Sequence, residues 1–122
     1  MNVLIVDNDL SMSERIAQKL KDWGHRSEIY ATGKKALASV RDKFFDLVLL
    51  EVFLPDVQAG ELIPQMKQIR PDVKIISMTG YNSRELEQKI RRQGILYYMI
   101  KPFEEAYLKS ILDYISLKKG GE

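Results

Sequence analysis

Three short apolar runs in the sequence each end at a charged residue, and stretches with helical periodicity separate them. The runs are VLIV before Asp7, DLVLL before Glu51 and YYMI before Lys101. Runs of this length that are rich in Val, Ile, Leu and Tyr are typical of buried parallel strands. The carboxyl ends of parallel strands meet along one edge of a sheet, and ligand sites form in the crevice there. We therefore expect two carboxylates and one ammonium group to share a small charged pocket.

Five segments carry strand signals, and a helical segment follows each of them. A chain that alternates strand and helix needs crossover connections, which produce a parallel sheet with helices on both faces. The predicted fold is therefore α/β, a doubly wound (βα)5 domain with a five-stranded parallel sheet. The predicted strands are residues 3–6, 27–30, 46–50, 73–78 and 96–100.

Capping patterns indicate where the helices begin and end. Residues 11–14 (SMSE) and 82–85 (NSRE) have the pattern of a capping box, in which a polar cap and a later Glu satisfy free N–H groups. Gly24 is expected to stop the first helix. Pro64 belongs to the third helix, and we place it in the first turn because N–H groups there have no helical partner to lose.

The length and composition suit one domain with its own hydrophobic core. The chain has 122 residues, 45% of them hydrophobic, and we predict one domain over 1–122 with a short tail at about 118–122. The lack of a span-length apolar stretch, of a signal peptide and of cysteine predicts a cytoplasmic protein without membrane contact. The formal charge of +2, from 19 basic and 17 acidic residues, is too small to indicate nucleic-acid binding.

The predicted strand ends supply carboxylate, hydroxyl and ammonium groups. Asp7 and Asn8 follow the first strand, and oxygen ligands without His or Cys suit a hard cation such as Mg²⁺. Asp9 is better explained as a cap of the helix that follows. Thr79 offers a hydroxyl group, although a Thr before Gly is also typical of turns. Lys101 precedes a proline, which keeps its backbone extended and allows a cis peptide bond.

The order of these motifs resembles the receiver domain of bacterial two-component response regulators over essentially the whole chain. VLIVDND resembles the acidic motif of the first strand, and FDLVLLEVFLP resembles the strand that carries the phospho-accepting aspartate. MTG resembles the switch Thr/Ser position, and YMIKPF resembles the invariant-lysine motif. Each motif is weak alone, but their order on this alternation of strands and helices is specific. The resemblance implies a flavodoxin-like strand order, 2-1-3-4-5.

The resemblance also implies a role for each matching position. In the family, an acidic pair and the acceptor aspartate hold Mg²⁺, and the acceptor receives a phosphoryl group from a histidine kinase or phosphotransfer protein. A hydroxyl group and the lysine then bind the phosphoryl oxygens, and a switch aromatic shifts. The matching positions are Asp7, Asn8 and Glu51 for the metal, Thr79 and Lys101 for the phosphoryl group, and Tyr98 for the switch.

The sequence departs from the family pattern at three places in this site. Glu51 stands at the acceptor position, Asn8 replaces the second acid and weakens the expected Mg²⁺ site, and the loop 55–60 is one residue longer than usual. Glu51 extends its carboxylate by roughly 1.5 Å, and phosphoryl transfer depends on in-line positioning, so we expect no acyl phosphate there. We expect Glu51 to reach Lys101 and Thr79 instead, which would hold a fixed, partly phosphomimetic state.

Output would then run through protein contacts of the face formed by the fourth helix, fifth strand and fifth helix. Arginine and aromatic residues are enriched at interfaces. Helix-flank packing would equally explain Tyr107 and Tyr114. The implied partners are a histidine kinase or phosphotransfer protein and an effector domain or protein, with a homodimer as a further option. The candidate switch and interface residues are Tyr98, Arg91, Arg92, Tyr107 and Tyr114.

The sequence is also compatible with other functions. One is a conventional receiver that binds Mg²⁺ and accepts a phosphoryl group, and another is an engineered mimetic in which Glu51 replaces the acceptor. An FMN-binding protein could share the topology, but it would need hydroxyl and free N–H groups where this chain has acids after the first strand. No nucleophile and base pair indicates a hydrolase. We therefore expect neither an organic cofactor nor an enzyme.

Overall fold

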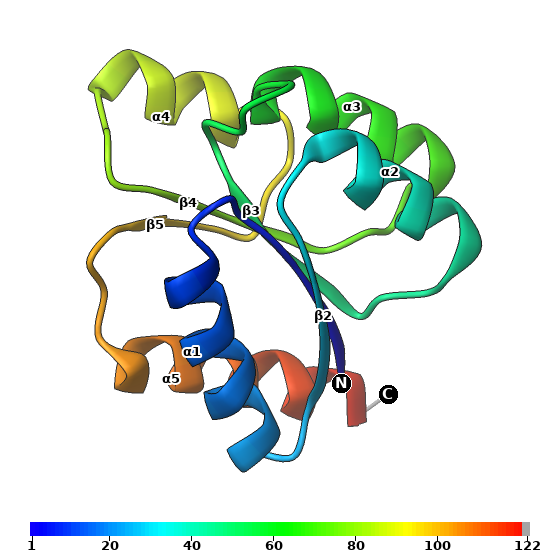
Figure 1. Ribbon diagram of the computed structural model, residues 1–122, viewed down its shortest axis with the longest axis vertical. Coiled ribbons are helices and arrows are strands. Elements are labelled where there is room, and N and C mark those ends of the chain that lie inside the picture. Colours follow the sequence, from blue (N-terminus) through cyan, green and yellow to red (C-terminus); the bar gives the residue numbers. More distant parts are fainter. Residues whose placement is uncertain (121–122) are drawn as a thin grey trace.

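The computed structural model describes residues 1–120, and within them five strands alternate with five helices (Figure 1). The strands are β1 (Asn2–Val6), β2 (Arg26–Tyr30), β3 (Leu47–Glu51), β4 (Ile75–Thr79) and β5 (Tyr97–Ile100). The helices are α1 (Leu10–Asp22), α2 (Gly33–Asp42), α3 (Ala59–Ile69), α4 (Arg84–Arg91) and α5 (Glu105–Gly120). All strand pairs are parallel, and the order is β2-β1-β3-β4-β5, which confirms the predicted fold.

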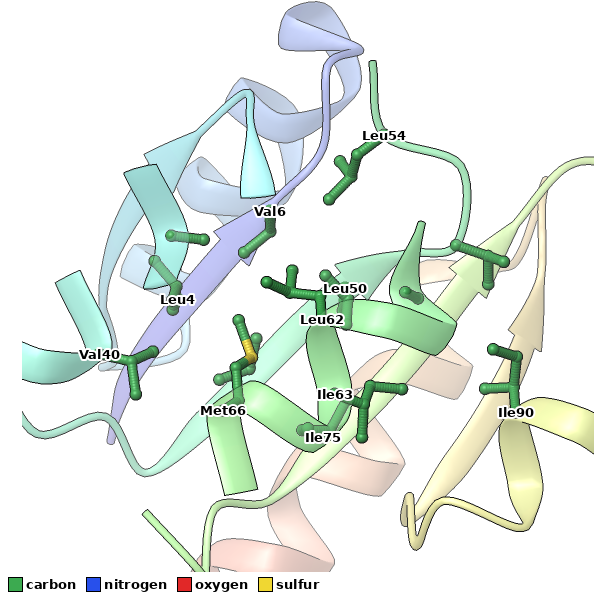
Figure 2. Packing of buried hydrophobic residues seen from close by; sticks show 14 of the residues in the cluster. Leu4, Val6, Val40, Leu50, Leu54, Leu62, Ile63, Met66, Ile75 and Ile90 are labelled. Carbon is green, nitrogen blue, oxygen red and sulfur yellow. The ribbon is translucent and has the colours of Figure 1, made fainter. Parts of the chain in front are cut away.

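The sheet separates two hydrophobic cores. Helices α1 and α5 cover one face, and α2, α3 and α4 cover the other (Figure 1). Successive residues of β1 point to opposite faces, so Val3 and Ile5 pack toward α1 and α5 while Leu4 packs toward α2 and α3. Figure 2 shows Leu62 and Met66 of α3 lying over this second face. Burial on both faces explains why the central strands are continuous apolar runs.

No helix within residues 1–120 is long and apolar enough to cross a membrane. Helix α5 runs to Gly120, so residues 118–120 of the predicted tail belong to it, and residues 121–122 lie outside the described part of the chain.

The observed helix caps differ from the predicted capping boxes by one or two residues. The carboxylate of Asp9 caps α1 by accepting a hydrogen bond from the backbone N–H of Met12 at 3.1 Å. The box that begins at Ser11 is therefore wrong, and the capping role of Asp9 is confirmed. Ser83, rather than Asn82, caps α4 by accepting the N–H three residues later at 3.1 Å. The amide of Asn82 is thereby left for a tertiary contact.

Pro64 lies in the second turn of α3, so its predicted place in the first turn is wrong. Helix α3 begins at Ala59, before the first large apolar residue that marked it in the sequence. In the second turn, each N–H group normally bonds the carbonyl four residues earlier. Because Pro64 has no N–H group, the carbonyl of Gly60 has no partner within the helix. The side-chain amide of Gln93 donates to this carbonyl at 2.9 Å. A residue beyond α4 thus completes the hydrogen bonding of α3.

Replacing Gln93 with alanine is expected to lower the free energy of unfolding by about 1 kcal/mol, because the carbonyl of Gly60 loses its partner. In a Pro64→Ala chain, the new N–H group can bond that carbonyl within the helix. Gln93→Ala should then cost less than half as much. Urea unfolding of the four chains gives the coupling as a double-mutant cycle. Equal costs in both backgrounds would show that the two residues do not share this carbonyl.

Candidate functional site

The structure brings Asp7, Glu51 and Lys101 together at the carboxyl edge of the sheet. Asp7 directly follows β1, Glu51 is the last residue of β3, and Lys101 directly follows β5. The ammonium Nζ of Lys101 lies 2.6 Å from Asp7 Oδ2 and 2.6 Å from Glu51 Oε1. The three side chains are 14%, 1% and 10% exposed for Lys101, Asp7 and Glu51. One partly buried ammonium group therefore bridges two buried carboxylates.

The second oxygen of each carboxylate accepts a backbone hydrogen bond. Asp7 Oδ1 accepts from the N–H of Asp9 at 2.9 Å, and Glu51 Oε2 accepts from the N–H of Phe53 at 3.0 Å. Burial lowers the pKa of Lys101, but its hydrogen bonds to the two carboxylates outweigh burial and leave that pKa above its ordinary value. The lysine is consequently charged at neutral pH, and its single ammonium group faces two carboxyl groups.

Thr79 uses its hydroxyl group within a turn. Its Oγ1 donates to the carbonyl of Tyr81 at 3.0 Å and accepts from the N–H of Tyr81 at 3.1 Å. The side chain is buried, as expected for a residue at the end of a central strand. Turn geometry thus accounts for this hydroxyl. The expected contact between Glu51 and Thr79 is not among the hydrogen bonds of the described residues.

The donors available to a metal at this edge are few. Asn8, which matches the second acid of the family's pair, is exposed. Among residues 1–120, no three His, Cys, Asp or Glu side chains are grouped closely enough to hold a metal ion. The two carboxylates that do meet, Asp7 and Glu51, share the ammonium of Lys101.

The loop between β3 and α3 is held against the start of α2 by hydrogen bonds. The carboxylate of Asp56 accepts hydrogen bonds from the N–H groups of Gly33 at 2.8 Å and Lys34 at 3.0 Å. The bond from Gly33 is the main cause that lowers the pKa of Asp56. Val57 packs so close to Gly33 that a β-carbon at position 33 would overlap it. Asp56 therefore caps the start of α2 and does not take part in the charged edge of the sheet.

Tyr98, the expected switch residue, is buried between α4 and the sheet. Its hydroxyl group donates to Asn82 Oδ1 at 2.8 Å, and the guanidinium carbon of Arg91 lies 5.7 Å from its ring centroid. Burial is the main cause that raises the pKa of Tyr98. The other candidates of the predicted interface, namely Arg92, Tyr107 and Tyr114, are exposed on α5 or at the end of α4. Their role at an interface stays a prediction.

An aromatic contact that sequence reasoning missed lies between the loops that follow β3 and β4. The rings of Phe53 and Tyr81 meet edge to face, with centroids 5.8 Å apart and an interplanar angle of 77°. The side chains belong to residues that are 38% and 74% exposed. Each ring stands two residues beyond a site residue, Glu51 or Thr79, at neighbouring strand ends. That common spacing is the signal by which the pair could have been found.

The family of the chain follows from comparison with known proteins. Residues 3–113 match the family model described as the response regulator receiver domain. The chain is 32% identical to the transcriptional regulatory protein ZraR of Klebsiella oxytoca over 85% of this chain and 24% of that protein. It is 31% identical to the DNA-binding transcriptional regulator NtrC of Azospirillum brasilense over 91% and 23% of the two chains. The chain thus spans about a quarter of the length of these relatives.

The structural comparison agrees. The crystal structure of a CheY-like response regulator receiver domain protein from Methanospirillum hungatei JF-1 superimposes with a TM-score of 0.89. The two are 31% identical, and the match covers 99% of this chain and 98% of the other. The sheet order β2-β1-β3-β4-β5 is the flavodoxin-like order that the motifs implied. The chain therefore belongs to the family of response regulator receiver domains of two-component signalling.

Proposed function

We propose that this receiver signals without being phosphorylated. Its own Glu51 forms an ion pair with Lys101, the residue that would otherwise bind a phosphoryl group. The observation that carries the proposal is the position of Lys101 Nζ, 2.6 Å from both Glu51 Oε1 and Asp7 Oδ2. A carboxylate carries one negative charge, whereas a phosphoryl group carries nearly two. Glu51 would therefore imitate the phosphorylated state only in part.

The hydrogen bonds of Glu51 also oppose phosphoryl transfer. Its Oε1 is bonded to Lys101 and its Oε2 to the N–H of Phe53. An attacking oxygen must lie in line with the phosphorus atom and its leaving group, and these two bonds hold the carboxylate in an orientation that Lys101 and Phe53 determine. A carboxylate held away from the in-line position by about 1 Å reacts on the order of a hundredfold more slowly.

We further propose that Mg²⁺ binds weakly here. A hard divalent cation takes several oxygen ligands, and when bound in this family's site it offsets the charge of the incoming phosphate. Asp7 and Glu51 are the carboxylates at the edge, and Asn8 adds only a neutral amide. The ammonium of Lys101 competes for the same oxygens. The donor set consequently fits Mg²⁺ poorly.

The output surface is proposed to be the face of α4, β5 and α5. Family members are signalling modules that interact with histidine kinases and effector domains. Arg92 and Tyr107 offer a cation and an aromatic ring on exposed positions, the residue types favoured at interfaces. The relatives named above are transcriptional regulators much longer than this chain, which supports an effector domain or an effector protein as partner. A homodimer through the same face is the second option.

Incubation of the unaltered chain with acetyl phosphate and Mg²⁺ tests the loss of phosphorylation. Intact-mass spectrometry is expected to find no added phosphoryl group, because the longer side chain of Glu51 is held by Lys101 and the N–H of Phe53 away from the in-line position. A conventional receiver in the same reaction controls for the activity of the phosphodonor. Stoichiometric, Mg²⁺-dependent phosphorylation at Glu51 would overturn the proposal and favour a conventional receiver.

A further inference from the structure

We propose that the contact between the rings of Phe53 and Tyr81 couples the Glu51 carboxylate to the hydrogen bond between Asn82 and Tyr98. The path consists of one ring contact between two hydrogen bonds, and the ring contact rather than the hydroxyl group of Thr79 joins the loops after β3 and β4. It rests on the proposed function, since such coupling has a signalling consequence only if position 51 sets the state of the domain.

The first step joins Glu51 to the ring of Phe53. The N–H of Phe53 donates to Glu51 Oε2 at 3.0 Å, so the carboxylate fixes the peptide that carries this ring. Phe53 also forms an isolated antiparallel bridge with Gln58, the residue before α3. The ring is therefore held from both sides of its backbone. A change at position 51 releases one of these two restraints.

The second step crosses from one loop to the other. The edge-to-face arrangement of Phe53 and Tyr81 is a geometry that aromatic pairs prefer. The backbone of Tyr81 is in turn anchored by two hydrogen bonds to the hydroxyl group of Thr79. Because these bonds occupy the hydroxyl, Thr79 serves as the anchor of the loop. The ring contact is then the direct link between the loops after β3 and β4.

The third step reaches the switch residue. Asn82 follows Tyr81 in the chain, and its Oδ1 accepts the hydrogen bond of the Tyr98 hydroxyl group at 2.8 Å. Tyr98 is buried, and Arg91 lies over its ring. A shift of the loop at Tyr81 moves the amide of Asn82 and weakens or strengthens this bond. The charge of Glu51 also acts on Tyr98 through space, and a test must separate the two routes.

The test follows the side-chain amide of Asn82 by two-dimensional ¹H–¹⁵N NMR in the full chain. Tyr98→Phe supplies the resonance position without the hydrogen bond. Glu51→Ala in the otherwise native chain is expected to move the Asn82 amide signal toward that position. In a Phe53→Ala chain, the same Glu51→Ala replacement should move the signal less than half as far. Phe53→Ala removes the ring contact but keeps the charge of Glu51. Any part of the Glu51→Ala effect that acts through space would therefore be the same in the Phe53→Ala chain as in the native chain.

Phe44→Ala is the matched control, because Phe44 is also an exposed phenylalanine but lies between α2 and β3 at the opposite edge of the sheet. The proposal is overturned if Phe53→Ala reduces the effect of Glu51 no more than Phe44→Ala does. It is equally overturned if Glu51→Ala leaves the Asn82 signal unmoved. Glu51→Met serves in place of Glu51→Ala if the latter does not fold, because methionine fills the space without an oxygen that could accept the N–H of Phe53. The readout needs no phosphodonor, so this coupling and the proposed loss of phosphorylation can fail separately.

Discussion

Replacing Lys101 with methionine is expected to lower the free energy of unfolding by about 3–5 kcal/mol, the usual cost of removing one partner from a buried ion pair. Methionine keeps most of the length of the side chain but has no charge. It would leave Asp7 and Glu51, whose side chains are 1% and 10% exposed, without the ammonium that bridges them. Two neighbouring carboxylates without a cation repel each other, and one of them is expected to take up a proton.

Urea unfolding followed by circular dichroism measures this loss. Lys109→Met is the matched control, because Lys109 pairs with Asp113 at 2.8 Å on the surface of α5. Exposed pairs of this kind contribute about 0.3–0.5 kcal/mol. Adding Glu51→Gln to the Lys101→Met chain should restore part of the stability, since it removes one buried charge. A loss for Lys101→Met that equals that of Lys109→Met would show that the buried pair does not stabilise the fold.

The same ion pair predicts how stability depends on alkaline pH. Burial lowers the pKa of Lys101, and its bonds to the two carboxylates raise that pKa by more than burial lowers it. In the folded chain the pKa therefore lies above the ordinary value of 10.5. A raised pKa means that the stabilisation is complete below the unfolded pKa and is lost as the pH rises through the folded one. The native chain should therefore lose stability more steeply above about pH 10.5 than Lys101→Met does.

The sheet could be predicted from sequence because its central strands are buried on both faces and so are uniformly apolar. The predicted third and fourth strands end at residues 50 and 78, but the observed β3 and β4 each continue for one more residue, the polar Glu51 and Thr79. Polarity does not end a strand when its backbone remains paired. The carbonyl of Thr79, for example, still accepts a hydrogen bond from the N–H of Lys101 at 2.8 Å.

The details of the helices depended on tertiary partners that a sequence pattern does not contain. Two residues near the start of α1 could each accept the free N–H groups, and Asp9 does so rather than Ser11. The place of Pro64 in α3 is tolerated because Gln93, far along the chain, bonds the carbonyl that the proline leaves free. Local propensity ranks such choices, but the packed neighbours decide between them.

The charged edge was predictable to the extent that topology determines it. Parallel strands bring their carboxyl ends to one edge, so Asp7, Glu51 and Lys101 had to share that edge once the strands were known. Because β4 lies between β3 and β5, their contact also requires the long side chain of Lys101. The ring contact of Phe53 and Tyr81 depends instead on the path of two loops after the strands end. No periodicity constrains such paths. This is why the contact between the loops was missed while the ion pair between the strand ends was expected.

The double replacement Glu51→Asp and Asn8→Asp is expected to make the chain accept a phosphoryl group from acetyl phosphate at least about a hundredfold faster than the unaltered chain. Aspartate withdraws the carboxylate by roughly 1.5 Å, away from Lys101 Nζ, which frees the ammonium to bind phosphoryl oxygens. The second aspartate adds the carboxylate that Mg²⁺ lacks beside Asp7. Intact-mass spectrometry over a time course, with and without Mg²⁺, measures the rate.

The single variants separate the two contributions to this gain. Glu51→Asp alone should be labelled slowly and only at high Mg²⁺, because it corrects the position of the acceptor but not the charge of the metal site. Asn8→Asp alone should stay unlabelled, since a better metal site does not bring Glu51 into line with the phosphorus atom. Labelling of Asn8→Asp at Glu51 would mean that the metal site, not side-chain length, blocks transfer. A double variant that stays unlabelled would instead place the block outside positions 8 and 51, and the loop at residues 55–60 is the third place where the sequence departs from the family pattern.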